Sequence, residues 1–262
     1  MFLFHERSII VITILWKGTH RMNIYSINDL LEQTSQFVNR HGHKAWFRGQ
    51  LDFTWNLLPG VKRVPYNEPK HEQYMATNFY IEACKRMKAT PKDQAGWICL
   101  MQHYGLPTRL LDLSESPLVA LYFAVTDDEY DNVDAALWLL DPIALNENQG
   151  YGNYLPPMDY HSVLEHIEPA FKDYLGSPDK ILACCSVEND LRMYVQQSTF
   201  TIHGSDMPLE SIVSGGDILT KFVIPKKEKS RLRWDLDILG FRLSTIFPDI
   251  EHISYEIKHN FS

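Results

Sequence analysis

The sequence predicts an α+β protein with a single domain, in which helices, mainly in the first half, pack on a mostly antiparallel sheet. Three observations predict this class. Apolar residues recur at helical spacing up to residue 125, shorter strand-like runs follow, and no linker divides the chain. The 262 residues are 45% apolar, enough for a core, and the net charge of −8 argues against a broad nucleic-acid-binding surface or a polybasic membrane anchor.

Helical spacing predicts four helices in the first half of the chain. They are a helix opened by Ser26 or Asn28, one through 75–87 ended by Pro91, one through 97–104 followed by Gly105, and a buried helix after Ser116-Pro117. A strand over 45–50, ending at Gly49, lies between the first two, and a polar stretch separates the last two.

The second half is predicted to contain most of the strands. Strand patterns cover 135–140, 199–203 and 219–224, the tail alternates weakly over 250–257, and one helix is expected near 162–174. The basic residues of 221–233 are expected to form a solvated loop, with nucleic-acid binding as a less favoured alternative.

The N-terminal segment 1–22 is expected to be an extension or an edge strand, with the domain over 23–262. Its apolar run, 9–16, has strand-like composition and is too short for a bilayer, which needs about 20 residues. Either Met1 or Met22 fits as the natural start. Four cysteines without a CxxC pair fit a reducing compartment, so a cytoplasmic location is expected.

Two segments contain the most specific polar residues: Trp46-Phe47-Arg48-Gly49-Gln50 and the run from Gln102 to Ala124. Arg48 offers a planar fork suited to phosphate or carboxylate, and an ion pair with Asp112 is the alternative. His103 fits either a site residue or a helix-capping one. The pair Arg109 and Asp112 fits either a salt-bridge network or a ligand site.

Ser114 and Ser116 precede the buried helix, and the free backbone amide groups at its N-terminus could bind an anion. N-capping of this helix is the favoured role for Ser116.

These two segments closely resemble the FRG domain family, named after its Phe-Arg-Gly signature, and the resemblance extends over residues 24–258. Further matching positions are Arg192, Gln196-Gln197, 200–203 and 247–249. The family name itself implies no reaction. The resemblance to the family implies a bacterial or phage protein that acts in conflict or defence.

The order of the motifs also resembles ADP-ribosyltransferases of the Arg–Ser–Glu type, which implies a similar fold and NAD as cofactor. On that resemblance the cofactor-binding residues are Arg48, Gly49, Arg109, Ser114, Tyr122 and Gln196, and the catalytic candidates are His103, Asp112, Glu115 and Gln197. The sequence has glutamine where the glutamate is expected, and glutamine lacks the negative charge that stabilises an oxocarbenium-like centre. The expected activity is ADP-ribosyl transfer or NAD hydrolysis, and the alternative is a non-catalytic nucleotide- or partner-binding module.

Other chemistries have less support in the sequence. P-loop, Rossmann and hydrolase-elbow motifs do not occur, and no metal site is expected. The histidines of 39–43, His161 and His166 lack the HExxH spacing and are expected at the solvated surface.

Overall fold

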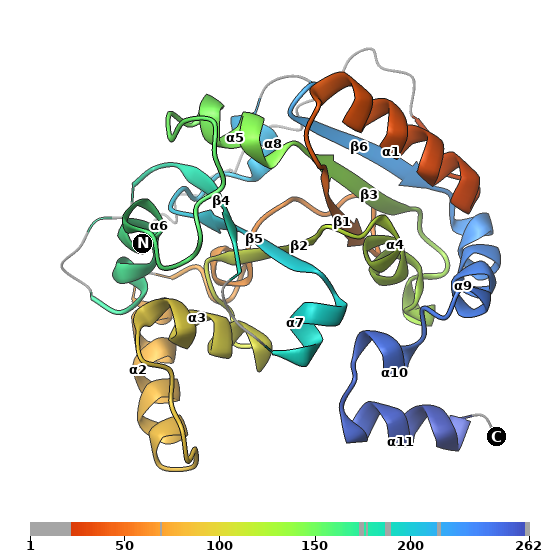
Figure 1. Cartoon of the computed structure of the whole chain (residues 1–262). Helices are drawn as coiled ribbons and strands as arrows, with labels where there is room; N and C mark the ends of the chain where they lie inside the picture. The colour runs from red at the N-terminus through yellow and green to blue at the C-terminus, as the bar shows by residue number, and fades with distance from the viewer. Residues whose placement is uncertain are drawn as a thin grey trace, which may run out of the picture.

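Among the residues that the structure describes, six strands form one sheet with the spatial order β4-β5-β2-β1-β3-β6, and every neighbouring pair is antiparallel (Figure 1). The computed structural model describes residues 22–259 except 69, 173–175, 177, 187–189 and 214–215. The strands are β1 (Trp46–Gln50), β2 (Leu110–Ser114), β3 (Ala135–Leu140), β4 (Ile181–Cys185), β5 (Ser198–His203) and β6 (Leu219–Ile224).

Helices precede, separate and follow these strands. The α-helices are α1 (Ile27–His41), α2 (His71–Cys84), α3 (Gln94–His103), α4 (Pro117–Val125), α5 (Pro142–Asn148), α6 (His161–Ile167), α7 (Leu191–Val195), α8 (Leu209–Ile212), α9 (Lys229–Ile238), α10 (Leu243–Ile246) and α11 (Ile250–His259). Short 3-10 turns lie at Gly60–Lys62, Asp128–Tyr130, Glu168–Ala170 and Lys226–Glu228.

Alternating side chains of the strands divide the core between two faces of the sheet. On one face, Phe47 and Leu137 pack with α1, α4 and α9, and Phe200 packs with α3 and α6. On the other face, Trp46 and Trp138 pack with α5 and α8. The half of the sheet formed by β1, β3 and β6 therefore lies between helices on both sides.

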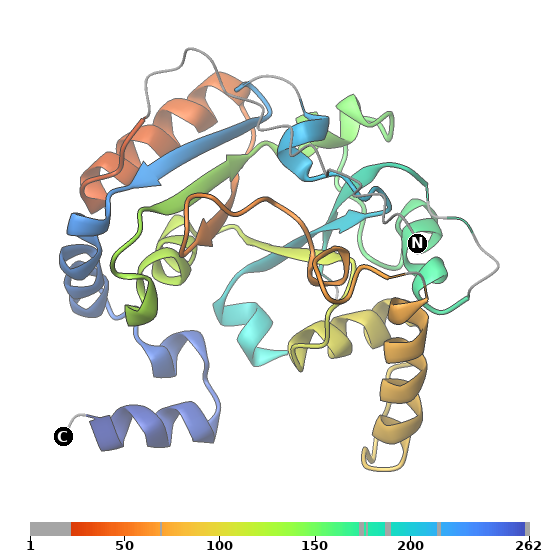
Figure 2. The same ribbon diagram turned by 180° about the vertical axis from the view of Figure 1, so that it is seen from behind.

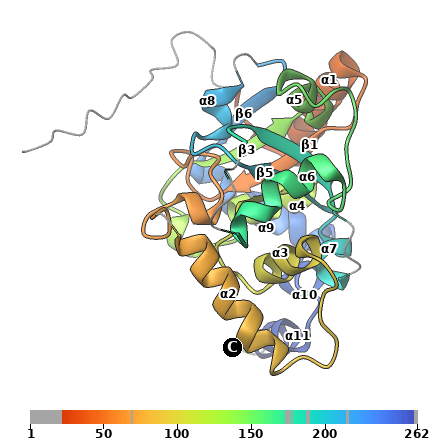
Figure 3. The same cartoon turned by 90° about the vertical axis from the view of Figure 1, so that its left-hand side faces the viewer.

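Two helical arms extend away from the sheet. In Figures 1 and 3, α2 runs downward from the end of α3, against which it packs through Ala76, Trp97 and Met101. The view from behind in Figure 2 shows α10 and α11 at the opposite lower corner, where the described chain ends.

The predicted fold class, α+β, is confirmed. Ser26 is the N-cap of α1 and Ser116 that of α4, while the predicted strands 135–140 and 219–224 have the observed bounds. The strand-like run 9–16 lies outside the described residues.

Three predictions are wrong. The weak alternation over 250–257 belongs to α11, in which Ile250, Ile253 and Ile257 recur at helical spacing. The predicted polar connection before Ser116 contains β2, and the basic run 221–233 contains the end of β6 and half of α9 instead of a loop. Among the described residues, no helix is long and apolar enough to cross a membrane.

Candidate functional site

The sheet is nearly split between β1 and β2. These strands pair at one position, Phe47 with Ser114, whereas β2 and β5 pair over five residues. The missing part of the ladder leaves the carbonyl group of Asp112 without a strand partner on that side. The Nη1 atom of Arg48 donates to this carbonyl oxygen at 2.5 Å, so a side chain replaces a backbone hydrogen bond.

Arg48 retains unused hydrogen-bonding capacity. Its side chain is half-buried, and its Nε atom is buried without a hydrogen-bond partner. Burial lowers the pKa of Arg48 to about 10, against the opposing effect of the Asp112 charge. The guanidinium therefore stays charged at neutral pH, and a desolvated cation of this kind attracts anions strongly.

A cavity of about 210 Å³ lies beside Arg48. Its walls come from β1, β2, the end of α3, and two loops that contain Gly60 and Pro107. The loops are in contact, because Val61 donates its backbone N–H to the Thr108 carbonyl oxygen at 3.2 Å. The polar side chains of the lining are Arg48, Arg63, Gln102, Thr108 and Asp112.

A chain of hydrogen bonds fixes the acidic wall of this cavity. Thr108 Oγ1 donates to Gln102 Oε1 at 2.5 Å, and Gln102 Nε2 donates to Asp112 Oδ2 at 2.6 Å. Asp112 is exposed, and its charge acts on both Arg48 and Arg63. The cavity thus contains two guanidinium groups and one carboxylate.

Arg109 lies outside this cavity, in a buried ion pair. Its Nε donates to Glu72 Oε1 at 2.8 Å, its Nη2 bonds the other carboxylate oxygen, and its Nη1 donates to the His166 carbonyl oxygen at 2.6 Å. Only 3% of Arg109 is exposed. These contacts place Arg109 in a salt-bridge network that joins α2 to α6, and its side chain does not line the cavity.

The residues around the β2–β5 junction are linked to each other. Ser114 Oγ donates to the Gln196 carbonyl oxygen at 2.6 Å and accepts from the Ser116 backbone N–H. Gln196 Nε2 donates to the Ile246 carbonyl oxygen, and Gln197 has a positive φ of 47°. Ser114 and Gln196 thus connect the sheet to α7 and α10.

A second cavity, of about 640 Å³, lies at this junction. Glu115 and Gln197 line it together with Tyr194, Phe241 and Ile246. The carboxylate of Glu115 lies 3.5 Å from the exposed Lys44 Nζ. The two cavities have no lining residue in common. Of the predicted site residues, Arg48 and Asp112 therefore line one cavity, and Glu115 and Gln197 line the other.

Gly49, Tyr122 and His103 lie in neither lining. A Cβ atom on Gly49 would be 1.8 Å from the Ala120 carbonyl oxygen, so Gly49 allows α4 to lie against β1. Tyr122 belongs to α4 and is buried in the core, where burial raises the pKa of its phenol to about 12. His103 has its Nδ1 atom 3.6 Å from Asp190 Oδ1.

Sequence reasoning missed Arg63 and Glu72. Arg63 lies in the loop rich in proline, asparagine and glycine, where one arginine has no distinguishing pattern. Glu72 is 37 residues from its partner Arg109 and has no local signal either. Only the fold brings these residues to their partners.

Two histidines differ from the predicted surface position. His166 is fully buried, with Nε2 2.7 Å from the Tyr151 hydroxyl, and His41 has its Nδ1 atom 3.4 Å from the buried Asp141 carboxylate. His161 is exposed, as predicted. Among the described residues, no group of three or more His, Cys, Asp and Glu side chains is placed to hold a metal ion.

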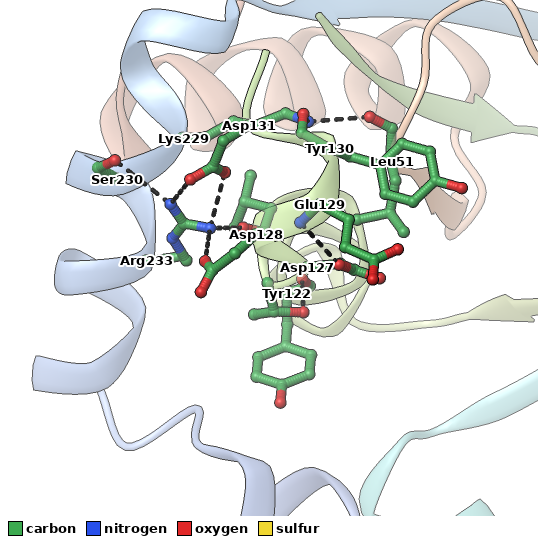
Figure 4. A network of polar contacts seen from close by, with 12 residues as sticks. Leu51, Tyr122, Asp127, Asp128, Glu129, Tyr130, Asp131, Lys229, Ser230 and Arg233 are labelled. Carbon is green, nitrogen blue, oxygen red and sulfur yellow. Dashed lines mark hydrogen bonds and ion pairs between the residues drawn. The ribbon is translucent and has the colours of Figure 1, made fainter. Parts of the chain in front are cut away.

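The basic run is largely occupied by structural contacts (Figure 4). Lys229 is buried and its Nζ donates to the carbonyl oxygens of Leu51 and Tyr130, at 2.9 and 2.7 Å. Arg233 contacts the carboxylates of Asp128 and Asp131, each at 2.7 Å. These cations hold α9 against the loop that precedes β3.

The fold and the site define a class: an α+β protein whose antiparallel sheet opens beside an arginine of its central strand. A comparison with protein families makes this more specific. Residues 43–132 match the model of the FRG domain, so this chain has an FRG domain, and the matched segment runs from just before β1 to just before β3. Neither the comparison with curated proteins nor the comparison with solved structures gives a match.

Proposed function

We propose that this FRG-domain protein binds the phosphates of a nucleotide such as NAD at Arg48 and uses NAD for ADP-ribosyl transfer or hydrolysis. The observation that carries the proposal is the half-buried guanidinium of Arg48, which lines an open cavity and has a buried Nε atom without a partner. A charged donor in that position gains hydrogen bonds when an anion enters.

The order of the strands supports the comparison with Arg–Ser–Glu enzymes. Arg48, Ser114 and Gln197 come from β1, the end of β2 and the turn before β5, and these three strands are neighbours in the sheet. Segments far apart in the sequence therefore present the three motif positions side by side. The cavity beside Arg48 is smaller than roughly 300 Å³, the lower end of the range for ligand pockets, so it accommodates only part of a dinucleotide.

The reaction needs a carboxylate near the ribose. When the bond between C1′ and the nicotinamide nitrogen breaks, nicotinamide leaves with the bonding electrons and positive charge develops at C1′. Water or a target nucleophile then bonds to C1′ and loses a proton. Gln197 can hydrogen-bond a ribose hydroxyl, and Glu115, in the same cavity, can supply the negative charge.

Two observations favour the alternative, a non-catalytic binding module. The cavity with Arg48 and the cavity with Glu115 have separate linings, and Ser114 is already engaged with the Gln196 carbonyl group. A module of this kind would bind NAD or ADP-ribose without releasing nicotinamide.

The test measures NAD binding by calorimetry and nicotinamide release by chromatography. We expect the protein to bind NAD and to release nicotinamide, and Arg48→Lys, which loses the bidentate fork, to weaken binding at least about tenfold. Glu115→Gln is expected to lower release with little effect on binding. The controls are Arg86→Lys and Glu129→Gln, at exposed positions outside both cavities.

Binding without release would favour the module, and neither binding nor release would exclude the proposal. A large drop in the melting temperature of Arg48→Lys, with unchanged affinity, would assign Arg48 a structural role only.

A further inference from the structure

Arg63 is a second guanidinium in the cavity beside Arg48 and has no role so far. It follows the 3-10 turn Gly60–Lys62, and its backbone N–H donates to the Gly60 carbonyl oxygen. Its Nε atom donates to the Leu58 carbonyl oxygen at 2.8 Å, and its Nη2 atom bonds the same oxygen. Those bonds orient the guanidinium, and its Nη1 atom has no hydrogen bond among the described residues.

The loop that positions Arg63 packs against the loop that contains Pro107, which forms another wall of the cavity. A Cβ atom on Gly60 would be 3.2 Å from the Pro107 Cα atom, so glycine allows the two loops to lie in close contact. Lys62, the preceding residue, is held by Asp206 at 2.5 Å. Arg63 is thus presented from a fixed loop, which lowers the entropy lost when a ligand binds.

The charged side chains that line the cavity are two guanidinium groups and one carboxylate. Burial lowers the pKa of both Arg48 and Arg63, and the charge of Arg63 adds to the lowering for Arg48. Asp112 is the carboxylate whose charge opposes this lowering for both arginines. Burial is the main cause that lowers the pKa of the nearby His203 to about 3, and the charges of Lys62 and Arg48 contribute to the same shift. One carboxylate, already bonded to Gln102, leaves the two guanidinium groups incompletely neutralised.

We propose that Arg63 and Arg48 together form a binding site for a pyrophosphate group, with one guanidinium for each phosphate. The two groups come from different elements, β1 and the loop after the 3-10 turn, and line the same 210 Å³ cavity. A pyrophosphate carries charge on both phosphates, so one phosphate can accept from Arg48 Nε while the other accepts from Arg63 Nη1, which is left over from the bonds to Leu58. A single phosphate supplies only one such group. This inference deepens the proposed function, on which its link to NAD rests.

The experiment measures binding of inorganic pyrophosphate and of inorganic phosphate by calorimetry. We expect pyrophosphate to bind more tightly than phosphate, and Arg63→Gln to weaken pyrophosphate at least about tenfold, because charge-assisted hydrogen bonds are lost. Arg63→Lys should recover part of the affinity. Arg231→Gln, an exposed arginine on α9, is the matched control and should leave binding unchanged.

Several outcomes would overturn the inference: no pyrophosphate binding, equal affinity for phosphate and pyrophosphate, or no effect of Arg63→Gln in a variant with unchanged melting temperature. The same titrations with NAD separate the two proposals. Pyrophosphate binding that depends on Arg63, with no NAD binding, would reject the proposed function alone. NAD turnover that is insensitive to Arg63→Gln, without pyrophosphate binding, would reject this inference alone.

Discussion

At the residue scale, the three residues Phe47, Arg48 and Gly49 have three different roles. Phe47 is buried in the core under α1 and α4, Arg48 reaches across the split sheet, and Gly49 lies against the backbone of α4. The signature therefore combines two packing residues with one half-buried guanidinium that lines the cavity. Of the three, only Arg48 presents a group to the cavity.

Gly49→Ala is expected to destabilise the protein by about 3 kcal/mol or more, because the new Cβ atom would be 1.8 Å from a backbone oxygen of α4, which cannot move aside cheaply. Gly216→Ala, where a Cβ would meet open space, is the control. Urea unfolding measures both variants. Similar midpoints for the two would contradict the packing role of Gly49.

At the element scale, α9 shows how a charged helix becomes part of a core. Leu232 and Leu236 pack against the sheet, and the first turn carries Lys229 into the interior, where its ammonium group bonds two carbonyl oxygens. Burial lowers the pKa of Lys229. The hydrogen bond from Lys229 to the Tyr130 carbonyl oxygen thereby connects the N-terminal end of α9 to the turn that follows α4.

Lys229→Met is expected to lower the free energy of unfolding by about 2 to 4 kcal/mol, since it removes two charge-assisted hydrogen bonds and leaves their acceptors buried. Lys227→Met, at an exposed position, should change it by less than about 0.5 kcal/mol. Thermal unfolding of both variants checks this prediction. An unchanged transition for Lys229→Met would mean that its ammonium group is solvated.

At the scale of the whole molecule, buried imidazoles couple stability to pH. His166 and His203 are both fully buried. Burial, with the charges of Arg109 and Lys180, lowers the pKa of His166 to about 4. In the unfolded chain this pKa is about 6.5, so between pH 6.5 and 4 the unfolded state binds more protons and stability falls as the pH falls.

Between pH 8 and pH 5, His166 alone is expected to remove about 2 kcal/mol from the free energy of unfolding. His166→Gln should reduce the pH dependence by that amount, whereas His161→Gln, at an exposed position, should leave it unchanged. Urea unfolding at the two pH values gives both differences. Parallel pH profiles for wild type and His166→Gln would show that His166 protonates without cost in the folded protein.

Local patterns predicted many elements of the fold correctly. The caps at Ser26 and Ser116 and the strand 135–140 depend on neighbouring residues, which the sequence shows directly. The prediction failed for β2, where polar residues interrupt a short strand, and for α11, whose isoleucines also fit a weak alternation. Short segments of this kind depend on contacts with distant parts of the chain.

By itself, the sequence determined the α+β class, the position of Arg48 beside a glycine in a strand, and the N-cap of α4 at Ser116. Only the tertiary structure decided that β1 and β2 separate after one residue pair, that Arg109 binds Glu72, and that Arg63 joins Arg48 at one cavity. The physical reason is range: caps and periodicity act over a few residues, whereas ion pairs and cavities depend on which strands become neighbours.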